Sequence, residues 1–273
     1  MLGAMVPLVI QWRSLSRVLL FLICCALLLV VTASLAIGQR SSLQALTIGS
    51  ISSLGCLALT VLFVRWDSLK LCDVGAMPNG NSLVLLVIGF ACGLFLVALH
   101  SFLVGVAGHI HWVRAARPAA YQAGLIGIGY LFLSVREELA FHGYPLRRLQ
   151  VILGVWGAQA TIAVAFALEH MAGGWSLAQA LWGAGMGSLL FGMASIATRG
   201  LAIPIGIHAA WNFGDWIRGN RSEPGVWRPE IDRGYEATVS WTGIWAYVAI
   251  MAVATICFWI WHRTRKAAHT CDS

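Results

Sequence analysis

Eight long apolar stretches constrain the fold of this chain more than any other feature. A helix needs about 20 mostly apolar residues to cross a bilayer, and a chain in lipid must satisfy its backbone polar groups internally. The sequence therefore predicts an all-α polytopic membrane protein with about eight transmembrane helices. The expected spans are residues 18–38, 43–64, 83–107, 121–141, 151–171, 177–197, 201–217 and 241–261.

The composition excludes the main alternatives to a membrane protein. Hydrophobic residues make up 59% of the chain and charged residues 11%, whereas a soluble domain carries about 25% charged residues. So little polar surface excludes a soluble enzyme, a disordered chain and a disulfide scaffold. No stretch resembles a basic nucleic-acid-binding helix, so we expect the lipid bilayer and no nucleic acid as a partner. Residues 1–273 are expected to form a single transmembrane domain.

The basic residues predict how the chain is oriented. With eight spans both termini lie on the same side, and that side holds 11 Lys or Arg residues against 7 on the other. Because the more basic side is usually cytoplasmic, we expect both termini in the cytoplasm, with the bacterial inner membrane as the location. The larger set is Arg13, Arg17, Arg65, Lys70, Arg136, Arg147, Arg148, Arg199, Arg263, Arg265 and Lys266; the smaller is Arg40, Arg114, Arg117, Arg218, Arg221, Arg228 and Arg233.

Ionisable groups within the apolar stretches are the candidates for chemistry, because a charge at mid-bilayer costs about 3 kcal/mol on insertion scales. Glu137 and Glu138 end one such stretch. Adjacent helical residues point about 100° apart, so one glutamate can face a cavity while the other makes a structural bond. Glu138 and His142 are four residues apart and can pair. The alternative is a helix end in water, with Arg136, Arg147 and Arg148 as partners.

Two further spans carry polar groups at helical spacing. Phe166 and His170 share one helix face, for which a capped surface histidine is the alternative. His208 and Asn212 lie one turn apart inside an apolar span, where a polar clasp between helices is the alternative. Pro204, with Gly206, is expected to loosen the backbone before them.

These groups from three spans indicate a hydrolytic site, with a base, hydrogen-bond donors and an orienting amide. The sequence has no H-E-x-x-H and no G-x-S-x-G, so neither a zincin nor a serine nucleophile elbow is supported. One geometric condition follows from the antiparallel order of spans four and five. Glu137 and His170 can meet only if span four continues past Glu137, towards Leu149.

The three motifs, in this order, resemble those of the CAAX-protease and bacteriocin-processing (CPBP) family, intramembrane endopeptidases related to the type 2 CAAX prenyl protease. The resemblance covers about 121–217, which is the expected catalytic core. The motifs are Glu137-Glu138-Leu-Ala-Phe-His142, Phe166-Ala-Leu-Glu-His170 and His208-Ala-Ala-Trp-Asn212.

The resemblance implies a role for each residue. Glu137 would be the general base that activates water, His170 would hold that water, and His208 and Asn212 would donate to the oxyanion. The family's first motif ends in Arg where this chain has His142. Arginine is always charged and clamps a carboxylate bidentately, whereas a histidine can be neutral near pH 7. The supporting residues would be Glu138, His142 and Phe166.

Other interpretations stay open at this point. No cofactor is expected, but zinc held by His170, His208 and Glu137 is an alternative, because three ligands with an open position suit catalytic zinc. The expected partner is a protein or peptide substrate at the membrane. The alternative functions are a non-catalytic membrane chaperone or immunity protein on the same fold, and a proton-coupled transporter.

Two further features bear on packing. Gly89-x-x-x-Gly93 and Gly183-x-x-x-Gly187 predict that helix backbones approach closely. Residues 218–240 form the one long polar loop, which we expect to be a solvated connector, with a lid or recognition loop as the alternative.

Overall fold

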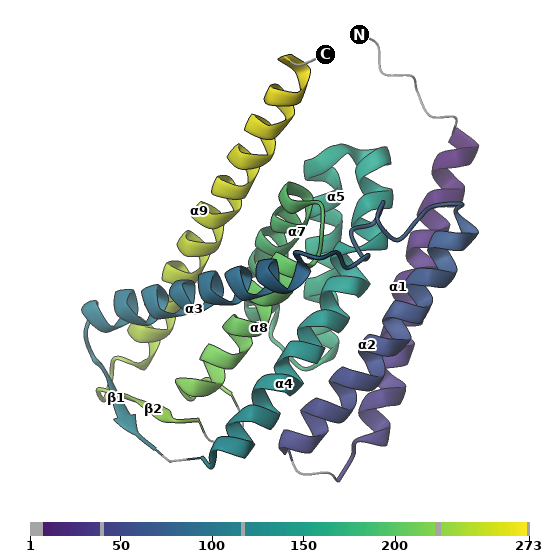
Figure 1. Ribbon diagram of the computed structural model, residues 1–273. Helices are drawn as coiled ribbons and strands as arrows, with labels where there is room; N and C mark the ends of the chain where they lie inside the picture. Colours follow the sequence, from purple (N-terminus) through teal and green to yellow (C-terminus); the bar gives the residue numbers. More distant parts are fainter. Residues whose placement is uncertain (1–7, 39–40, 116–117, 222–224, 272–273) are drawn as a thin grey trace.

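The computed structural model describes residues 8–38, 41–115, 118–221 and 225–271, with the side chains of 8–11, 41–42 and 266–271 outside the description. Arg40, Arg117 and the side chain of Lys266, which entered the charge count, therefore lie outside the described residues. The described part is almost entirely helical (Figure 1), which confirms the all-α prediction.

The helices follow the apolar stretches closely. They are α1 (Leu8–Leu35), α2 (Ser41–Trp66), α3 (Ser82–Val106), α4 (Ala120–Glu137), the π-helix η1 (Glu138–His142), α5 (Tyr144–Ala172), α6 (Leu177–Gln179), the π-helix η2 (Ala180–Gly185), α7 (Met186–Thr198), α8 (Ala202–Ile217) and α9 (Glu236–Cys271). Two short strands, β1 (Ile110–Arg114) and β2 (Trp227–Ile231), pair antiparallel.

Six helical stretches among the described residues are long and apolar enough to cross a membrane. One of them, Ala120–Ala172, contains two expected spans, and the 16 residues of α8 are too few to count among the six. The chain is thus an integral, polytopic membrane protein, and the number of eight spans stays a prediction.

The turn between the fourth and fifth expected spans lies later than the sequence indicated. The expected break at residues 142–150 is largely helical, and α5 instead bends at Gly154, whose φ of 70° and ψ of −178° favour glycine. Arg136 and Glu169 lie 18 residues before and 15 residues after this glycine, and they form an ion pair of 2.6 Å. The helical segment that begins with α4 therefore continues past Glu137, and after Gly154 the chain returns alongside it (Figure 1). This meets the condition under which Glu137 and His170 can lie close together.

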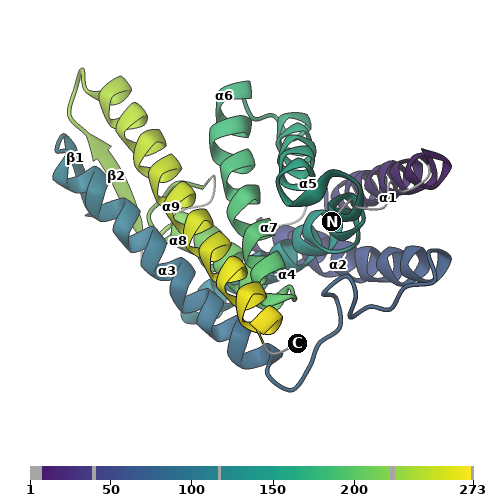
Figure 2. The same cartoon turned by 90° about the horizontal axis from the view of Figure 1, so that it is seen from above.

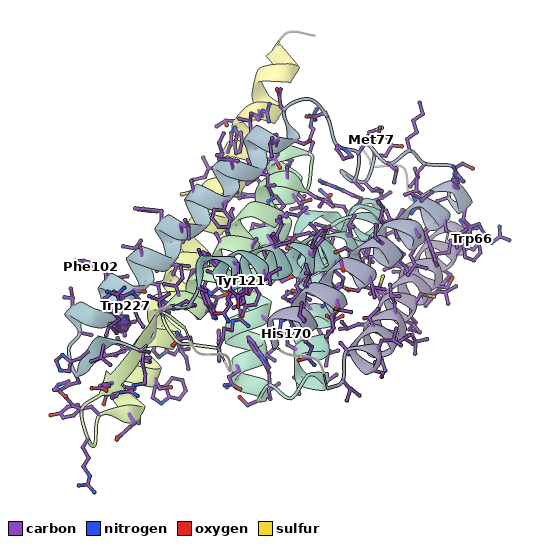
Figure 3. The ribbon with its side chains drawn as sticks, turned by 60° about the horizontal axis from the view of Figure 1, so that its bottom comes forward. Trp66, Met77, Phe102, Tyr121, His170 and Trp227 are labelled. Atoms are coloured by element: carbon purple, nitrogen blue, oxygen red, sulfur yellow. The ribbon has the colours of Figure 1, made fainter. Side chains whose placement is uncertain are left out.

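The helices form a central group between two flanking groups (Figure 2). Helices α4, α5, α7 and α8 lie in the middle, α1 and α2 flank them on one side, and α3, α9 and the small sheet flank them on the other. The flanking helices direct apolar side chains outward: Trp66 on α2 is 52% exposed and Phe102 on α3 is 64% exposed (Figure 3). Helices that are apolar on their outer face suit contact with lipid.

Small residues allow α3 and α8 to pack closely. A Cβ on Gly89 would lie 2.3 Å from the carbonyl oxygen of Ile203, and one on Gly93 would lie 2.6 Å from that of Ile207. The prediction for this glycine pair is confirmed. Gly206 lies in the same contact between α3 and α8. The helix α8 is regular at this residue, so the prediction that Pro204 and Gly206 loosen the backbone is wrong.

The second glycine pair and the long loop differ from expectation. Gly183 and Gly187 face the ring of Trp175 and the hydroxyl of Tyr247, rather than another helix backbone. The loop over 218–240 is more than a solvated connector, because it contributes β2, which pairs with β1 from the loop after α3. Side chains of this sheet reach the wall of the cavity described below.

Candidate active site

A widened helical turn carries the first motif. Residues Glu138–His142 form the π-helix η1, and all five are buried. Pro145, which follows at the start of α5, has no N–H to donate to a carbonyl one turn earlier, so it interrupts the regular hydrogen-bond ladder. Single π-helical turns of this kind are frequent at functional sites.

The two adjacent glutamates have different surroundings, as their angular offset predicted. Glu137 borders the cavity and contacts Arg136 at 2.9 Å. Glu138 is fully buried, and its two oxygens contact His142 Nδ1 at 2.7 Å and His208 Nδ1 at 2.8 Å. The spacing-based pairing of Glu138 with His142 is therefore present.

His208 bridges the two glutamates. Its Nδ1 contacts Glu138, and its Nε2 lies 3.3 Å from Glu137 Oε2. A carboxylate only accepts hydrogen bonds, so both contacts can be hydrogen bonds only if the ring carries two protons or if one carboxyl group is protonated. Phe191 stacks on the ring at 4.4 Å and fixes its plane.

His170 is held by its own helix. Its Nδ1 donates to the backbone carbonyl of Phe166 at 2.9 Å, and the two rings lie 4.5 Å apart. Trp175 packs edge-on against the same imidazole at 4.8 Å. A histidine that donates from Nδ1 keeps Nε2 for other partners. Figure 3 looks onto the end of the molecule at which α4 begins, with His170 near the centre of the view.

Arg221 fixes the orientation of the Asn212 amide. The guanidinium of Arg221 contacts Asn212 Oδ1. Because arginine only donates, the amide must present its oxygen to Arg221, and this leaves its NH₂ group as a donor. Arg221 also lies 3.6 Å from a carboxylate oxygen of Asp215.

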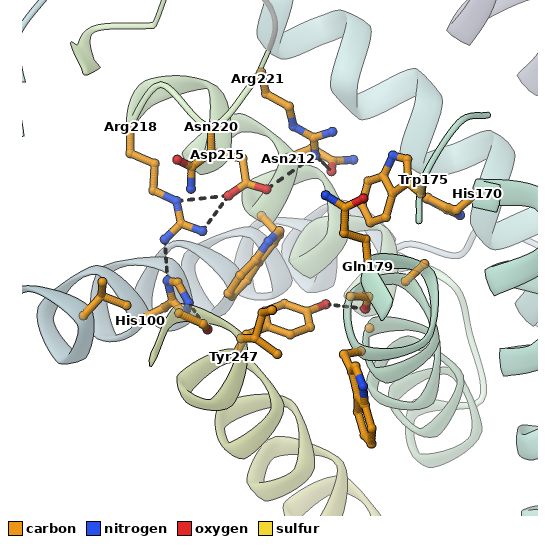
Figure 4. A pocket seen from close by; sticks show the side chains of 18 of the residues that line it. His100, His170, Trp175, Gln179, Asn212, Asp215, Arg218, Asn220, Arg221 and Tyr247 are labelled. Carbon is orange, nitrogen blue, oxygen red and sulfur yellow. Dashed lines mark hydrogen bonds and ion pairs between the residues drawn. The ribbon is translucent and has the colours of Figure 1, made fainter. Parts of the chain in front are cut away.

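A cavity of about 670 Å³ is lined by all four predicted catalytic residues. Figure 4 shows two of them, His170 and Asn212, beside the polar residues of its wall. Phe166 also lines it, whereas Glu138 and His142 lie behind its wall. Strand residues close one side of the cavity, from β1 with Ile110 and Trp112 and from β2 with Pro229 and Ile231. The predicted residues in its lining are Glu137, Phe166, His170, His208 and Asn212.

Sequence reasoning named Arg136 only as a partner in water, and it missed a second polar cluster altogether. Arg136 is 3% exposed and bridges Glu137 to Glu169. A second polar cluster lines the cavity, where Arg218 bonds Asp215 at 2.6 Å and His100 at 2.6 Å. The contacts of Arg136 with Glu169 and of Arg218 with His100 join positions far apart in the chain, so spacing along one helix could not have indicated them.

Two arginines that the alternative interpretation placed beside the glutamates lie elsewhere. Arg147 donates to the backbone oxygen of Ser195 at 2.7 Å, and Arg148 pairs with the buried Asp67 at 2.8 Å. Arg136 is thus the one of the three for which a glutamate contact is described. The alternative of a helix end in water is wrong, because Glu138 and His142 are fully buried.

A metal-ligand cluster is not evident in the described part of the chain. Among those residues, no three His, Cys, Asp or Glu side chains converge as ligands of a metal ion would. The zinc alternative, with His170, His208 and Glu137 as ligands, rests on the sequence and is left to experiment.

The fold and the site define a class of protein. This is an integral membrane protein whose carboxylate, imidazole and amide groups from separate helices converge on one cavity, as hydrolytic chemistry requires. Residues 119–214 match the family described as type II CAAX prenyl endopeptidase Rce1-like. The match over this segment confirms the resemblance that the three motifs carried. No curated protein matches the chain.

Proposed function

We propose that this protein is a glutamic-type intramembrane endopeptidase, in which Glu137 activates the water that hydrolyses a peptide bond. The observation that carries the proposal is the convergence of Glu137, His170, His208 and Asn212 on one cavity. The family match supports peptide-bond hydrolysis as the reaction class.

The reaction proceeds through a tetrahedral intermediate. Glu137 takes a proton from water, and the oxygen attacks the carbonyl carbon of the scissile bond. The C–N bond then breaks, and the proton held by Glu137 passes to the leaving amine. General-base catalysis of this type contributes roughly 10²–10⁴-fold to the rate.

The remaining groups orient the water and stabilise the intermediate. His170 directs Nε2 to the water, since Nδ1 is occupied by the Phe166 carbonyl. Asn212 donates its NH₂ group to the oxyanion, in the orientation that Arg221 imposes. The Nε2 atom of His208 is 3.3 Å from Glu137, a long contact that can give way to the oxyanion as charge develops.

Glu138 and His142 support the reacting groups from behind the cavity wall. Glu138 holds His208 at 2.8 Å, and His142 holds Glu138 at 2.7 Å. Their full burial protects this arrangement from water. Their role is to position the imidazole of His208 rather than to touch the substrate.

The proposed substrate is a protein or peptide segment at the bilayer, and the proposed location is the bacterial inner membrane. Aromatic residues line much of the cavity, among them Trp112, Trp182, Trp211 and Tyr247. Such a wall suits apolar side chains of an extended segment. A prenyl group on the substrate is one case to be tested, since the family description names prenyl endopeptidases.

Cleavage by the full-length protein in liposomes tests the proposal. Three probes separate the substrate classes: a quenched farnesylated CAAX peptide, the same peptide without the farnesyl group, and fluorescein-labelled casein. We expect cleavage of at least one probe, with a defined product by mass spectrometry. Cleavage of none, by protein that is folded by circular dichroism, would favour the chaperone, immunity-protein or transporter alternatives.

Chelation tests the metal-free form of the proposal. Activity is expected to survive strong chelators, because the mechanism uses only side chains of this chain. Complete loss that zinc restores would instead make His170, His208 and Glu137 ligands.

A further inference from the structure

His142 occupies the position at which the resembled family has arginine, and its ring has two partners. Nδ1 contacts Glu138 Oε2 at 2.7 Å, and Nε2 contacts Ser188 Oγ at 3.0 Å. All three residues are fully buried. Ser188 comes from α7, 46 positions further along the chain, and belongs to none of the three motifs.

Hydrogen-bond accounting makes Ser188 necessary for this arrangement. Glu138 already accepts from His208 on its other oxygen. An imidazole has two ring nitrogens, and one left without a partner in a buried site costs about 1–3 kcal/mol. A serine hydroxyl both donates and accepts, so Ser188 can satisfy Nε2 whether or not that nitrogen carries a proton.

The shape of α7 also holds the ring in one place. A Cβ on Gly192, one turn after Ser188, would lie 3.0 Å from His142 Cδ2 and 2.1 Å from Gln159 Oε1. Ser195, on the next turn, donates to the backbone oxygen of His142 at 3.1 Å. One face of α7 thus fixes both the ring and the main chain of His142, through small residues at three successive turns.

We propose that Ser188 is a positioning residue, which holds His142 with Nδ1 directed at Glu138. The line of contacts runs Ser188, His142, Glu138, His208 and Glu137. Where the resembled family has an arginine with several donors, this chain has His142, whose imidazole contacts Glu138 with one nitrogen and Ser188 with the other. The effect on catalysis rests on the proposed function, whereas the effect on the ring does not.

Ring-nitrogen NMR of ¹⁵N-histidine protein tests the effect on the ring without an activity assay. The His142 signal is assigned by its absence in His142→Gln. In the wild type we expect a protonated Nδ1 and an Nε2 whose shift reports a hydrogen bond. Ser188→Ala should shift the Nε2 signal, or mix the two tautomers. An unchanged ring signal in folded Ser188→Ala protein would overturn the proposal.

The cleavage assay tests the effect on catalysis, with Ser52→Ala as the matched control. Both serines are fully buried, but Ser52 lies on α2 and its hydroxyl donates to the backbone oxygen of Ile48 in its own helix. We expect Ser188→Ala to lower kcat about five- to tenfold with little change in KM, since one hydrogen bond is lost. Ser52→Ala should lower the melting temperature about as much as Ser188→Ala does and leave kcat within about twofold.

The outcomes separate the two proposals. Equal kcat losses in both serine variants, in step with their melting temperatures, would reduce Ser188 to a packing residue and overturn its positioning role. If no probe is cleaved by the wild type but Ser188→Ala still shifts the His142 ring signal, the proposed function fails while the positioning of the ring stands.

Discussion

Charge in the site is shared among a few buried groups. The glutamates at 137, 138 and 169 face one buried arginine, Arg136, and two histidines, His142 and His208. Removing one partner of such a buried pair is typically more costly, at about 3–5 kcal/mol, than losing an exposed ion pair, at about 0–1 kcal/mol. Stability and activity will therefore fall together for many substitutions here, and informative variants must keep the shape of the side chain.

Arg221→Ala should lower kcat about tenfold, because the Asn212 amide loses the contact that orients it towards the oxyanion. Its ring partner, Tyr130, lies 5.6 Å from the guanidinium and is expected to stay in place. Initial rates with the cleaved probe provide the measurement. Arg228→Ala is the control, because that arginine is exposed on β2, where it pairs with Glu230. Equal rates for the two variants would contradict the role assigned to Arg221.

At the scale of residues, the sequence predicted the residues of the three motifs better than their partners outside the motifs. The i, i+4 spacing indicated that Glu138 meets His142, and the motif resemblance indicated that Glu137, His170, His208 and Asn212 share one site; all four line the cavity. Ser188 and Arg221 could not be predicted in the same way. Each lies far along the chain or in a loop, and its partner is set by how α7 or the loop after α8 packs.

Interruptions of regular helix position the site at the scale of elements. The π-helix η1 buries the side chains of Glu138 and His142. The bend at Gly154 reverses the chain, so that His170 lies beside the cavity that Glu137 also lines. Hydropathy located the spans but not these interruptions. Residues 144–153 are helical although they contain Arg147 and Arg148, because those side chains find buried partners in Ser195 and Asp67.

Gly206→Ala should destabilise the protein, since its Cβ would lie 2.3 Å from the backbone oxygen of Leu86 and force α3 away from α8. Overpacking of this kind costs roughly 1–3 kcal/mol. Gly124→Ala in α4 is the matched control, as a Cβ there has nothing within 4 Å and alanine favours helix by about 1 kcal/mol. Thermal unfolding in detergent should show shifts of opposite sign, and a Gly206→Ala protein as stable as the wild type would contradict the close packing.

At the scale of the whole molecule, the cavity lies towards the end opposite the first turns of α1 and the last turns of α9. Strands β1 and β2, which contribute to its wall, lie at one end of the molecule, whereas the first turns of α1 and the last turns of α9 lie at the other (Figure 1). If both termini are cytoplasmic, as the basic residues indicate, substrates approach the sheet-covered end from the non-cytoplasmic side.

Reporter fusions test this orientation. A fusion after Lys266 should report the cytoplasm, and one within 221–236 should report the opposite side. The expected reason is the bias of Lys and Arg towards the side that holds the termini. Two fusions on the same side would contradict the span count, and an exchanged pair would place the sheet end of the cavity in the cytoplasm.

Glu137→Gln is the most direct test of the central claim, because it keeps the shape of the side chain and removes the proton acceptor. The account predicts that cleavage of the probe falls roughly 10²–10⁴-fold, while the melting curve stays close to that of the wild type. Glu230→Gln, at an exposed position on β2, is the control and should cleave at the wild-type rate. A folded Glu137→Gln protein that cleaves at the wild-type rate would contradict the assignment of Glu137 as the base.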